Sequence, residues 1–151
     1  MEEYEYNFKV KSIDPYINYC KKNNYKEQIV KQNRIVYESS YNDNLIARIT
    51  TNNGEETILD FKNVNQNDDL LKISNESLPL KVDNLKVIYS ILDTLNFKKK
   101  SNLYRIRYIY KKDDVTFEID DYTEPAMKVV AIEGNKIEVD QIYDEIKDME
   151  N

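Results

Sequence analysis

The stretch "EYEYNFKV", residues 3–10, alternates polar and apolar side chains without interruption. One face of an extended chain would carry Tyr4, Tyr6, Phe8 and Val10. The other face would carry Glu3, Glu5, Asn7 and Lys9. This period of two predicts a β-strand with one apolar face. Its polar face is then either exposed to solvent or directed at a ligand. The rest of the sequence helps to decide between these two alternatives.

The composition limits the chemistry of any site. The 151 residues predict a single domain, 1–151. One cysteine, Cys20, and no histidine exclude an internal disulfide, a Cys/His metal site and a histidine-activated nucleophile. A metal ion would have to be bound by carboxylates, which suits Mg²⁺, Mn²⁺ or Ca²⁺. The two glycines provide no glycine-rich phosphate loop, so side chains would have to bind any phosphate.

Charge and hydropathy bear on the partners. The net charge of −6 argues against a nucleic-acid partner. No apolar run approaches the ~20 residues of a membrane span, and no charged leader with an apolar core opens the sequence. We therefore expect a cytoplasmic protein with no membrane partner.

The remaining pattern predicts a strand-rich chain with three helices. The helices are expected at roughly 14–23, with Asp14 as N-cap and Pro15 in the first turn, at 83–97 behind an Asp cap, and at 138–149. Strands are expected at 26–39, on both sides of Asn53-Gly54, in a hairpin over 103–120 that turns at 111–114, and at 126–134. The polar segment 65–83 predicts a loop with at most one short strand.

Charged residues recur on the predicted strands: Glu3, Glu5, Lys9, Arg48, Lys62, Arg105, Arg107, Glu118, Asp120 and Glu133. Exposure to solvent is the simpler explanation of such a face. The face of Arg105 and Arg107 also carries Ile109, however, while tyrosines line the opposite face, which is unusual for a strand with one wet side. A closed antiparallel β-barrel with a polar interior and helices outside accounts for both observations. We therefore predict an α+β fold whose barrel holds a metal-bound polyphosphate.

Five motifs in order resemble the CYTH superfamily, the triphosphate tunnel metalloenzymes, which include class IV adenylyl cyclases and thiamine triphosphatases. The family's Glu-x-Glu-x-Lys strand is matched by Glu5-x-Asn7-x-Lys9. Its further motifs resemble "LIAR" at 45–48, "LDFK" at 59–62, "RIRYIY" at 105–110 and "AIEG" at 131–134. The resemblance implies an eight-stranded antiparallel tunnel with flanking helices. The chain departs from the family pattern at Asn7, Ile46 and Ala131.

The resemblance also implies roles for the tunnel residues. The residues expected to be catalytic are Glu5, Lys9, Glu118 and Glu133. Those expected to bind the triphosphate are Lys9, Arg48, Lys62, Arg105 and Arg107. Those expected to bind Mg²⁺ or Mn²⁺ are Glu3, Glu5, Asp120 and Glu133. The losses at Asn7 and Ala131 should weaken metal binding more than phosphate binding.

The function implied is metal-dependent hydrolysis of a linear triphosphate: inorganic triphosphate, thiamine triphosphate or a nucleotide. One alternative is a catalytically degenerate module that binds a nucleotide or polyphosphate without turnover, and another is a class IV-type adenylyl cyclase. The expected partner is a small-molecule triphosphate or nucleotide. A tunnel broken at one edge would also favour a homodimer.

Overall fold

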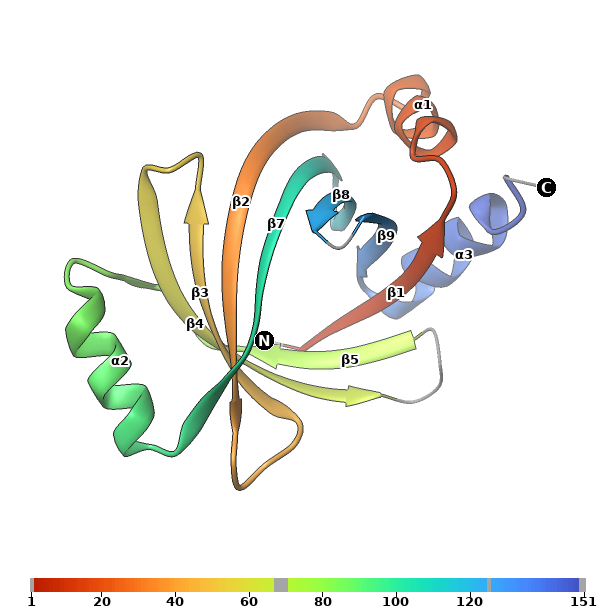
Figure 1. Cartoon of the computed structure of the whole chain (residues 1–151). Coiled ribbons are helices and arrows are strands. Elements are labelled where there is room, and N and C mark those ends of the chain that lie inside the picture. Colours follow the sequence, from red (N-terminus) through yellow and green to blue (C-terminus); the bar gives the residue numbers. More distant parts are fainter. Residues whose placement is uncertain (1, 67–70, 125, 150–151) are drawn as a thin grey trace.

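The computed structural model describes residues 2–66, 71–124 and 126–149. Within them the chain forms one sheet of nine strands and three helices (Figure 1). The strands are β1 (Glu2–Val10), β2 (Lys26–Ser39), β3 (Leu45–Asn52), β4 (Glu56–Gln66), β5 (Leu71–Glu76), β6 (Leu80–Lys81), β7 (Phe97–Lys112), β8 (Val115–Glu124) and β9 (Ala126–Gly134). The helices are α1 (Asp14–Lys22), α2 (Leu85–Thr94) and α3 (Lys136–Ile146).

Eight of the strands close into a barrel. Their order is β3-β2-β7-β8-β9-β1-β5-β4, and β4 pairs again with β3. Every pairing is antiparallel, and the two-residue β6 adds to β4 outside the ring. The predicted eight-stranded antiparallel barrel with flanking helices is confirmed. None of the helices that the structure describes has the length and apolar character needed to span a bilayer.

The apolar cores lie outside the barrel, between its wall and the helices. Helices α1 and α3 cover one part of the wall, where Tyr16, Phe117 and Ile132 are buried. Helix α2 covers β3 and β4 on the other side, where Ile49, Leu59 and Leu92 are buried (Figure 1). Because the apolar face of each strand is used outside, the polar residues of the same strand point into the barrel.

The opening stretch shows this division directly. Tyr6 stacks on Tyr143 of α3 with a centroid distance of 4.2 Å, and the Tyr6 hydroxyl donates a hydrogen bond to Asp140 at 2.6 Å. Phe8 packs edge-on against Tyr16 of α1 and against Tyr143. The aromatic face of β1 therefore anchors two helices, and its polar face is left for the interior.

The connection between α2 and β7 differs from the prediction. The helix expected over 83–97 ends at Thr94, and Asn96 turns the chain with φ of 60°. Phe97 is buried against α2 and begins β7, so that Lys98–Lys100 lie in a strand. Long-range pairing with β2, which places Tyr37 opposite Lys99, outweighs the local helical pattern.

Other boundaries also shift. Ile13, not Asp14, is the N-cap of α1, and Asn84, not Asp83, caps α2 by accepting from the N–H groups of Lys86 and Val87. The segment 65–83 contains the end of β4, then β5 and β6, whereas a loop with at most one strand was expected. Residues 67–70 of that segment lie outside the described part. The last helix begins at Lys136 rather than 138 and ends at Ile146 rather than 149.

Two turns fix the register of the wall. Asn53 and Gly54 have φ of 55° and 71°, as the predicted type I′ hairpin requires. Gly134 ends β9 with φ of 153°, and a Cβ there would lie 2.6 Å from the backbone oxygen of Asp114. Only glycine allows this approach, which sets the position of the preceding Glu133.

Candidate functional site

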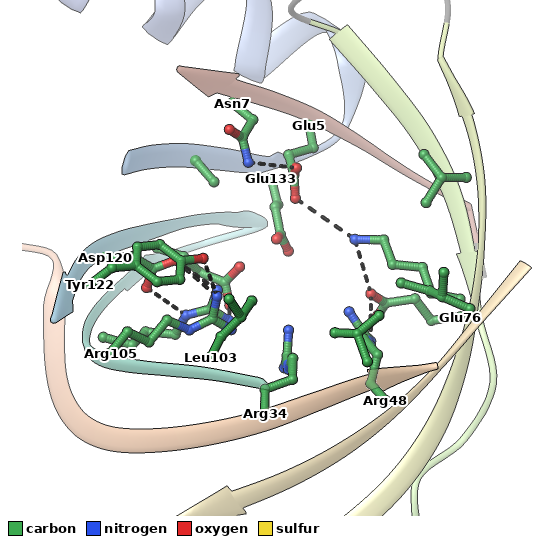
Figure 2. A pocket seen from close by; sticks show the side chains of 17 residues that line it. Glu5, Asn7, Arg34, Arg48, Glu76, Leu103, Arg105, Asp120, Tyr122 and Glu133 are labelled. Carbon is green, nitrogen blue, oxygen red and sulfur yellow. Dashed lines mark hydrogen bonds and ion pairs between the residues drawn. The ribbon is translucent and has the colours of Figure 1, made fainter. Parts of the chain in front are cut away.

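A cavity of about 430 Å³ lies inside the barrel, and each of the eight barrel strands contributes to its lining (Figure 2). Its walls are strongly charged on opposite sides. Glu5, Asn7 and Glu133 lie along one wall in Figure 2, and Arg34 and Arg48 lie along the facing one. The interior is therefore a polar site and not a packed core.

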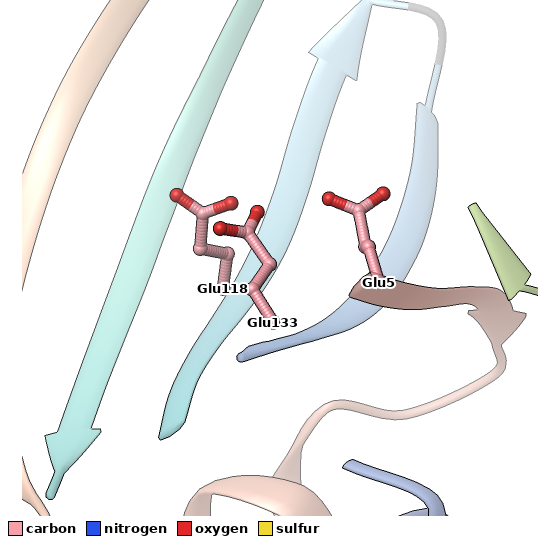
Figure 3. Close-up of side chains that lie close together, drawn as sticks. All are labelled: Glu5, Glu118 and Glu133. Atoms are coloured by element: carbon pink, nitrogen blue, oxygen red, sulfur yellow. The ribbon is translucent and has the colours of Figure 1, made fainter. Parts of the chain in front are cut away.

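Three carboxylates converge on the acidic wall: Glu5 from β1, Glu118 from β8 and Glu133 from β9 (Figure 3). One oxygen of each lies within 4.8 Å of the others. The register produces this arrangement, because Glu5 is directly opposite Glu133 and Glu118 is opposite Ala131. Asn7 donates from Nδ2 to Oε2 of Glu5 at 3.4 Å.

The three carboxylates do not share one charge state. Burial disfavours the charged form of Glu118, but the Arg107 guanidinium and a hydrogen bond from Glu133 outweigh it and lower the Glu118 pKa to about 2. Burial, the charge of Glu118 and hydrogen bonds to Glu118 and Glu5 raise the pKa of Glu133 well above its usual value. Glu133 therefore holds its proton more tightly than an ordinary glutamate does.

The acidic wall fits Mg²⁺ or Mn²⁺. Carboxylate oxygens are the donors that these hard cations prefer. Three carboxylates with oxygens within 4.8 Å of one another concentrate negative charge, which a divalent cation would compensate. The residues that would hold it are Glu5, Glu118 and Glu133.

Most cations of the cavity already have acidic partners. Arg107 makes a two-pronged contact with Asp120, with distances of 2.8 and 2.9 Å, and a third bond to Glu118 at 2.8 Å. Arg48 bonds to Asp60 at 2.9 Å and to Glu76 at 3.1 Å. These pairs are buried and hydrogen-bonded, so they hold the guanidinium planes in fixed orientations.

The remaining cations are paired more loosely. Arg105 bonds to the side-chain oxygen of Gln32 at 2.8 Å and to the Tyr122 hydroxyl at 2.6 Å, and lies 3.5 Å from Asp120. Lys62 lies 3.6 Å from Glu76 and 4.0 Å from Glu5. These groups can exchange part of their contacts for a ligand anion.

Arg34 of β2 differs from the other cations. Its Nε donates to the hydroxyl of Thr50 at 3.0 Å, and no ion pair joins it to an acidic side chain within the described ranges. Burial and the neighbouring charges of Arg48, Arg107 and Arg105 lower its pKa to about 9. A guanidinium in this position is short of negative charge and is therefore the group best placed to receive an anion.

The structure brings most of the predicted site residues together. The cavity is lined by Glu5, Arg48, Lys62, Arg105, Arg107, Glu118, Asp120 and Glu133. Asp120, expected to bind metal, is held by Arg107, while Glu118 takes its place in the acidic cluster. Glu3 is half-buried beside the cavity, where burial and the charge of Glu76 raise its pKa.

Two residues depart from the sequence prediction. Lys9 is exposed and lies outside the cavity lining, because β1 carries it beyond Asn7 toward solvent. Arg34 was missed, although it shares a face of its strand with Gln32 and Val36, the same signal of a charge between interior neighbours that pointed to Arg48. No family motif falls on 26–39, so the resemblance gave no reason to single it out.

Several solved structures have the same fold. The PH1012 protein of Pyrococcus horikoshii is 21% identical over 97% of this chain and 89% of that chain, with a TM-score of 0.76. A candidate adenylyl cyclase from Hippeastrum, described as having a dominant triphosphatase activity, is 11% identical over 97% and 87%, with a TM-score of 0.68. The Mimivirus capping enzyme triphosphatase is 14% identical over 98% and 87%, with a TM-score of 0.62.

Identities this low establish the fold and leave the activity open. No family model and no curated protein matches this chain. The closed antiparallel barrel with its flanking helices is the fold that these solved structures share, as the motifs predict.

Proposed function

We propose that this chain, which has the triphosphate tunnel fold of the CYTH superfamily, binds a linear triphosphate with Mg²⁺ or Mn²⁺ inside its barrel and hydrolyses it. The observation that carries the proposal is the half-buried Arg34 guanidinium, which has no acidic partner among the described residues and faces a cluster of three carboxylates. A phosphate anion that carries a divalent cation would place negative charge at Arg34 and positive charge at the three carboxylates.

The charge count of the cavity supports a metal-bound ligand. Five cationic side chains line it: Arg34, Arg48, Lys62, Arg105 and Arg107. Five acidic ones also line it: Glu5, Glu76, Glu118, Asp120 and Glu133. With all ten ionised, the lining has no net charge. A bare polyanion would meet as much repulsion as attraction there, whereas a metal–triphosphate complex can set its cation against the carboxylates.

Each group of residues then has a task. Arg34, Arg48 and Lys62 bind the phosphoryl oxygens and orient the chain of phosphates along β2, β3 and β4. Arg107 holds the carboxylates of Glu118 and Asp120 in place. When bound, the divalent cation would neutralise phosphoryl charge. We assign to the Glu133 carboxylate, which can hold the cation through one oxygen, the orientation of the attacking water and acceptance of its proton through the other oxygen.

Phosphate release tests the proposal. Tripolyphosphate and adenosine triphosphate would each be offered with Mg²⁺ and then Mn²⁺. We expect release by the native chain and a loss of about 100-fold or more in kcat/KM for Arg34→Gln. Lys31→Gln is the matched control, because Lys31 is an exposed cation on the opposite face of the same strand. Equal loss in both variants, or undiminished activity in Arg34→Gln, would contradict the assigned role.

The second candidate is a module that binds a triphosphate without turnover. It is favoured by the exposed position of Lys9 and by the neutral residues Asn7 and Ala131 beside the carboxylates. Calorimetric binding that Arg34→Gln abolishes, without phosphate release under any metal, would select this candidate. Formation of cyclic AMP from adenosine triphosphate in the same reactions would instead select the cyclase.

A further inference from the structure

The cavity has a second row of lining residues that is entirely aliphatic. The strands β7, β2, β3 and β4 are neighbours in the barrel, and each presents to the cavity an aliphatic side chain two positions from a basic one. The basic row is Arg105, Arg34, Arg48 and Lys62. The aliphatic row is Leu103, Val36, Ile46 and Val64. Each aliphatic residue lies two positions along its strand from the basic one, so both point inward.

Strand pairing makes the two rows continuous. Leu103 is directly opposite Arg34, and Val36 is directly opposite Arg48. Ile46 is directly opposite Lys62. Leu103, Val36 and Ile46 are thus each adjacent to the basic residue of the next strand. The two rows run side by side across four of the eight barrel strands, one as a basic band and the other as an aliphatic band.

The aliphatic band is the outer one. Along β3, Arg48 is buried, Ile46 is half-buried and the chain reaches exposed Asn44. Along β1, Glu5 is buried, Asn7 is half-buried and Lys9 is exposed. The aliphatic band therefore lies between the charged interior and a mouth of the barrel.

The facing strands continue this band without charge. Asn7 lies two residues outward from Glu5, and Tyr122 lies two residues beyond Asp120. Tyr122 presents a ring beside Arg105, whose guanidinium carbon lies 5.4 Å from the ring centroid. Outside the charged interior, the cavity thus offers aliphatic, amide and phenol groups.

We infer that the ligand is an organic ester of triphosphoric acid rather than inorganic triphosphate, with its organic group in this outer band and its phosphates in the charged interior. The inference rests on the proposed function. Inorganic triphosphate has ionised oxygens at both ends, so a chain reaching the outer band would lose hydration there without gaining a partner. An ester replaces that terminal charge by carbon, which the aliphatic band removes from water.

Ile46 is the residue that determines this preference. It is directly opposite Lys62 on β4 and Glu38 on β2, so it is an aliphatic side chain between two charged ones. An arginine at this position would extend the charged interior outward by one row. The aliphatic side chain instead ends the charged region at Arg48 and Lys62.

Calorimetry with Mg²⁺ tests the inference by comparing tripolyphosphate, butyl triphosphate and adenosine triphosphate. The butyl ester probes the aliphatic contact without a base or sugar. We expect both esters to bind the native chain at least about tenfold more tightly than tripolyphosphate. Ile46→Arg should remove or reverse this ratio. Ile29→Arg should retain it, because Ile29 is 51% exposed on the outer face of β2 and receives the same charge change.

The outcomes separate the two proposals. If tripolyphosphate binds as tightly as the esters, triphosphate binding stands and the inference fails. If no probe binds, both fail. If Ile46→Arg does not fold, Ile46→Thr and Val36→Thr provide the comparison. If neither of these variants lowers the ratio of ester affinity to tripolyphosphate affinity, the role of the aliphatic band is overturned. Preference for adenosine triphosphate alone would also overturn it, because recognition would then rest on the nucleoside.

Discussion

Arg34 shows how a single residue can be placed for a ligand at the expense of stability. It is half-buried near the guanidinium groups of Arg48, Arg105 and Arg107, and it has no carboxylate partner within the described ranges. Arg34→Gln should therefore raise the melting temperature of the ligand-free protein, since it removes an uncompensated charge. The same variant should lose triphosphate binding. Thermal unfolding without ligand, followed by calorimetry, measures both effects.

Arg48→Gln is the contrasting substitution. It would leave Asp60 and Glu76 without their main partner, so we expect a loss of about 3 kcal/mol in the free energy of unfolding. Denaturant titration of both variants gives the comparison. A fall in stability for Arg34→Gln as large as that for Arg48→Gln would contradict the view that Arg34 awaits a ligand.

Glu133 predicts a pH dependence. Its pKa is raised in the folded state, so its proton stabilises the metal-free protein at low pH, and this stability is lost as the pH rises from the usual glutamate range through the raised pKa. Glu118 has the opposite effect, because its pKa is lowered to about 2 in the folded state. Its ionised form stabilises the folded protein above the usual glutamate pKa, and this stability is lost as the pH falls toward about 2. We expect the melting temperature of the metal-free chain to fall as the pH rises from the usual glutamate range through the raised pKa of Glu133.

Glu133→Gln should remove that fall, and Mg²⁺ should offset it in the native chain by binding the folded state. Melting curves of both chains across this range, each with and without Mg²⁺, make the measurement. If the melting temperature of Glu133→Gln falls with pH as much as that of the native chain, the pH dependence belongs to another group.

At the residue scale, the sequence predicted most of the site because alternation assigns each charge to a face. It missed Arg34 because no motif covers β2, and it placed Lys9 in the site because parity gives the face of a residue but not its depth. Depth depends on where the strand leaves the barrel, which a single strand does not specify.

Among the elements, the turn between β7 and β8 and its contact with Gly134 at the end of β9 position the carboxylate cluster. Gly134→Ala would place a Cβ 2.6 Å from the Asp114 backbone oxygen, so backbone must move. We expect a loss of about 2 kcal/mol or more in stability and weaker Mg²⁺ binding, because Glu133 is the adjacent residue. Denaturant titration and a metal titration measure the two effects.

Gly54→Ala is the matched control. Gly54 also has positive φ, 71°, but a Cβ there would meet no atom within 4 Å. It should lose only the ~1 kcal/mol that the backbone conformation costs a non-glycine residue and leave metal binding unchanged. Equal losses of stability in the two variants would mean that position 134 requires glycine because of its backbone conformation and not because of the contact with Asp114.

Elements with strong local signals were predicted, and those that depend on distant partners were not. The Asn53-Gly54 hairpin carries its own turn chemistry, and the helix over Leu85–Thr94 carries a clear apolar stripe. Lys98–Lys100 give no strand signal of their own and are extended because β2 pairs with them. The same holds for Leu71–Glu76, a strand between β1 and β4 in a polar stretch of sequence.

For the whole molecule, the balance of charge in the cavity predicts strict metal dependence. Five acidic and five cationic side chains line it, so a bare triphosphate gains little there. Chelation of divalent cations should abolish tripolyphosphate and adenosine triphosphate binding rather than weaken it slightly. Calorimetry with and without excess chelator makes the test. Undiminished binding in chelator would show that the cationic residues suffice alone.

The two external cores have a consequence for how such a chain can change over generations. Packing against the helices is secured by one set of alternate residues, and the interior is formed by the residues between them. Selection for folding and selection for chemistry therefore act on interleaved positions of the same strands. The lining can therefore change residue by residue while the packing against the helices is retained.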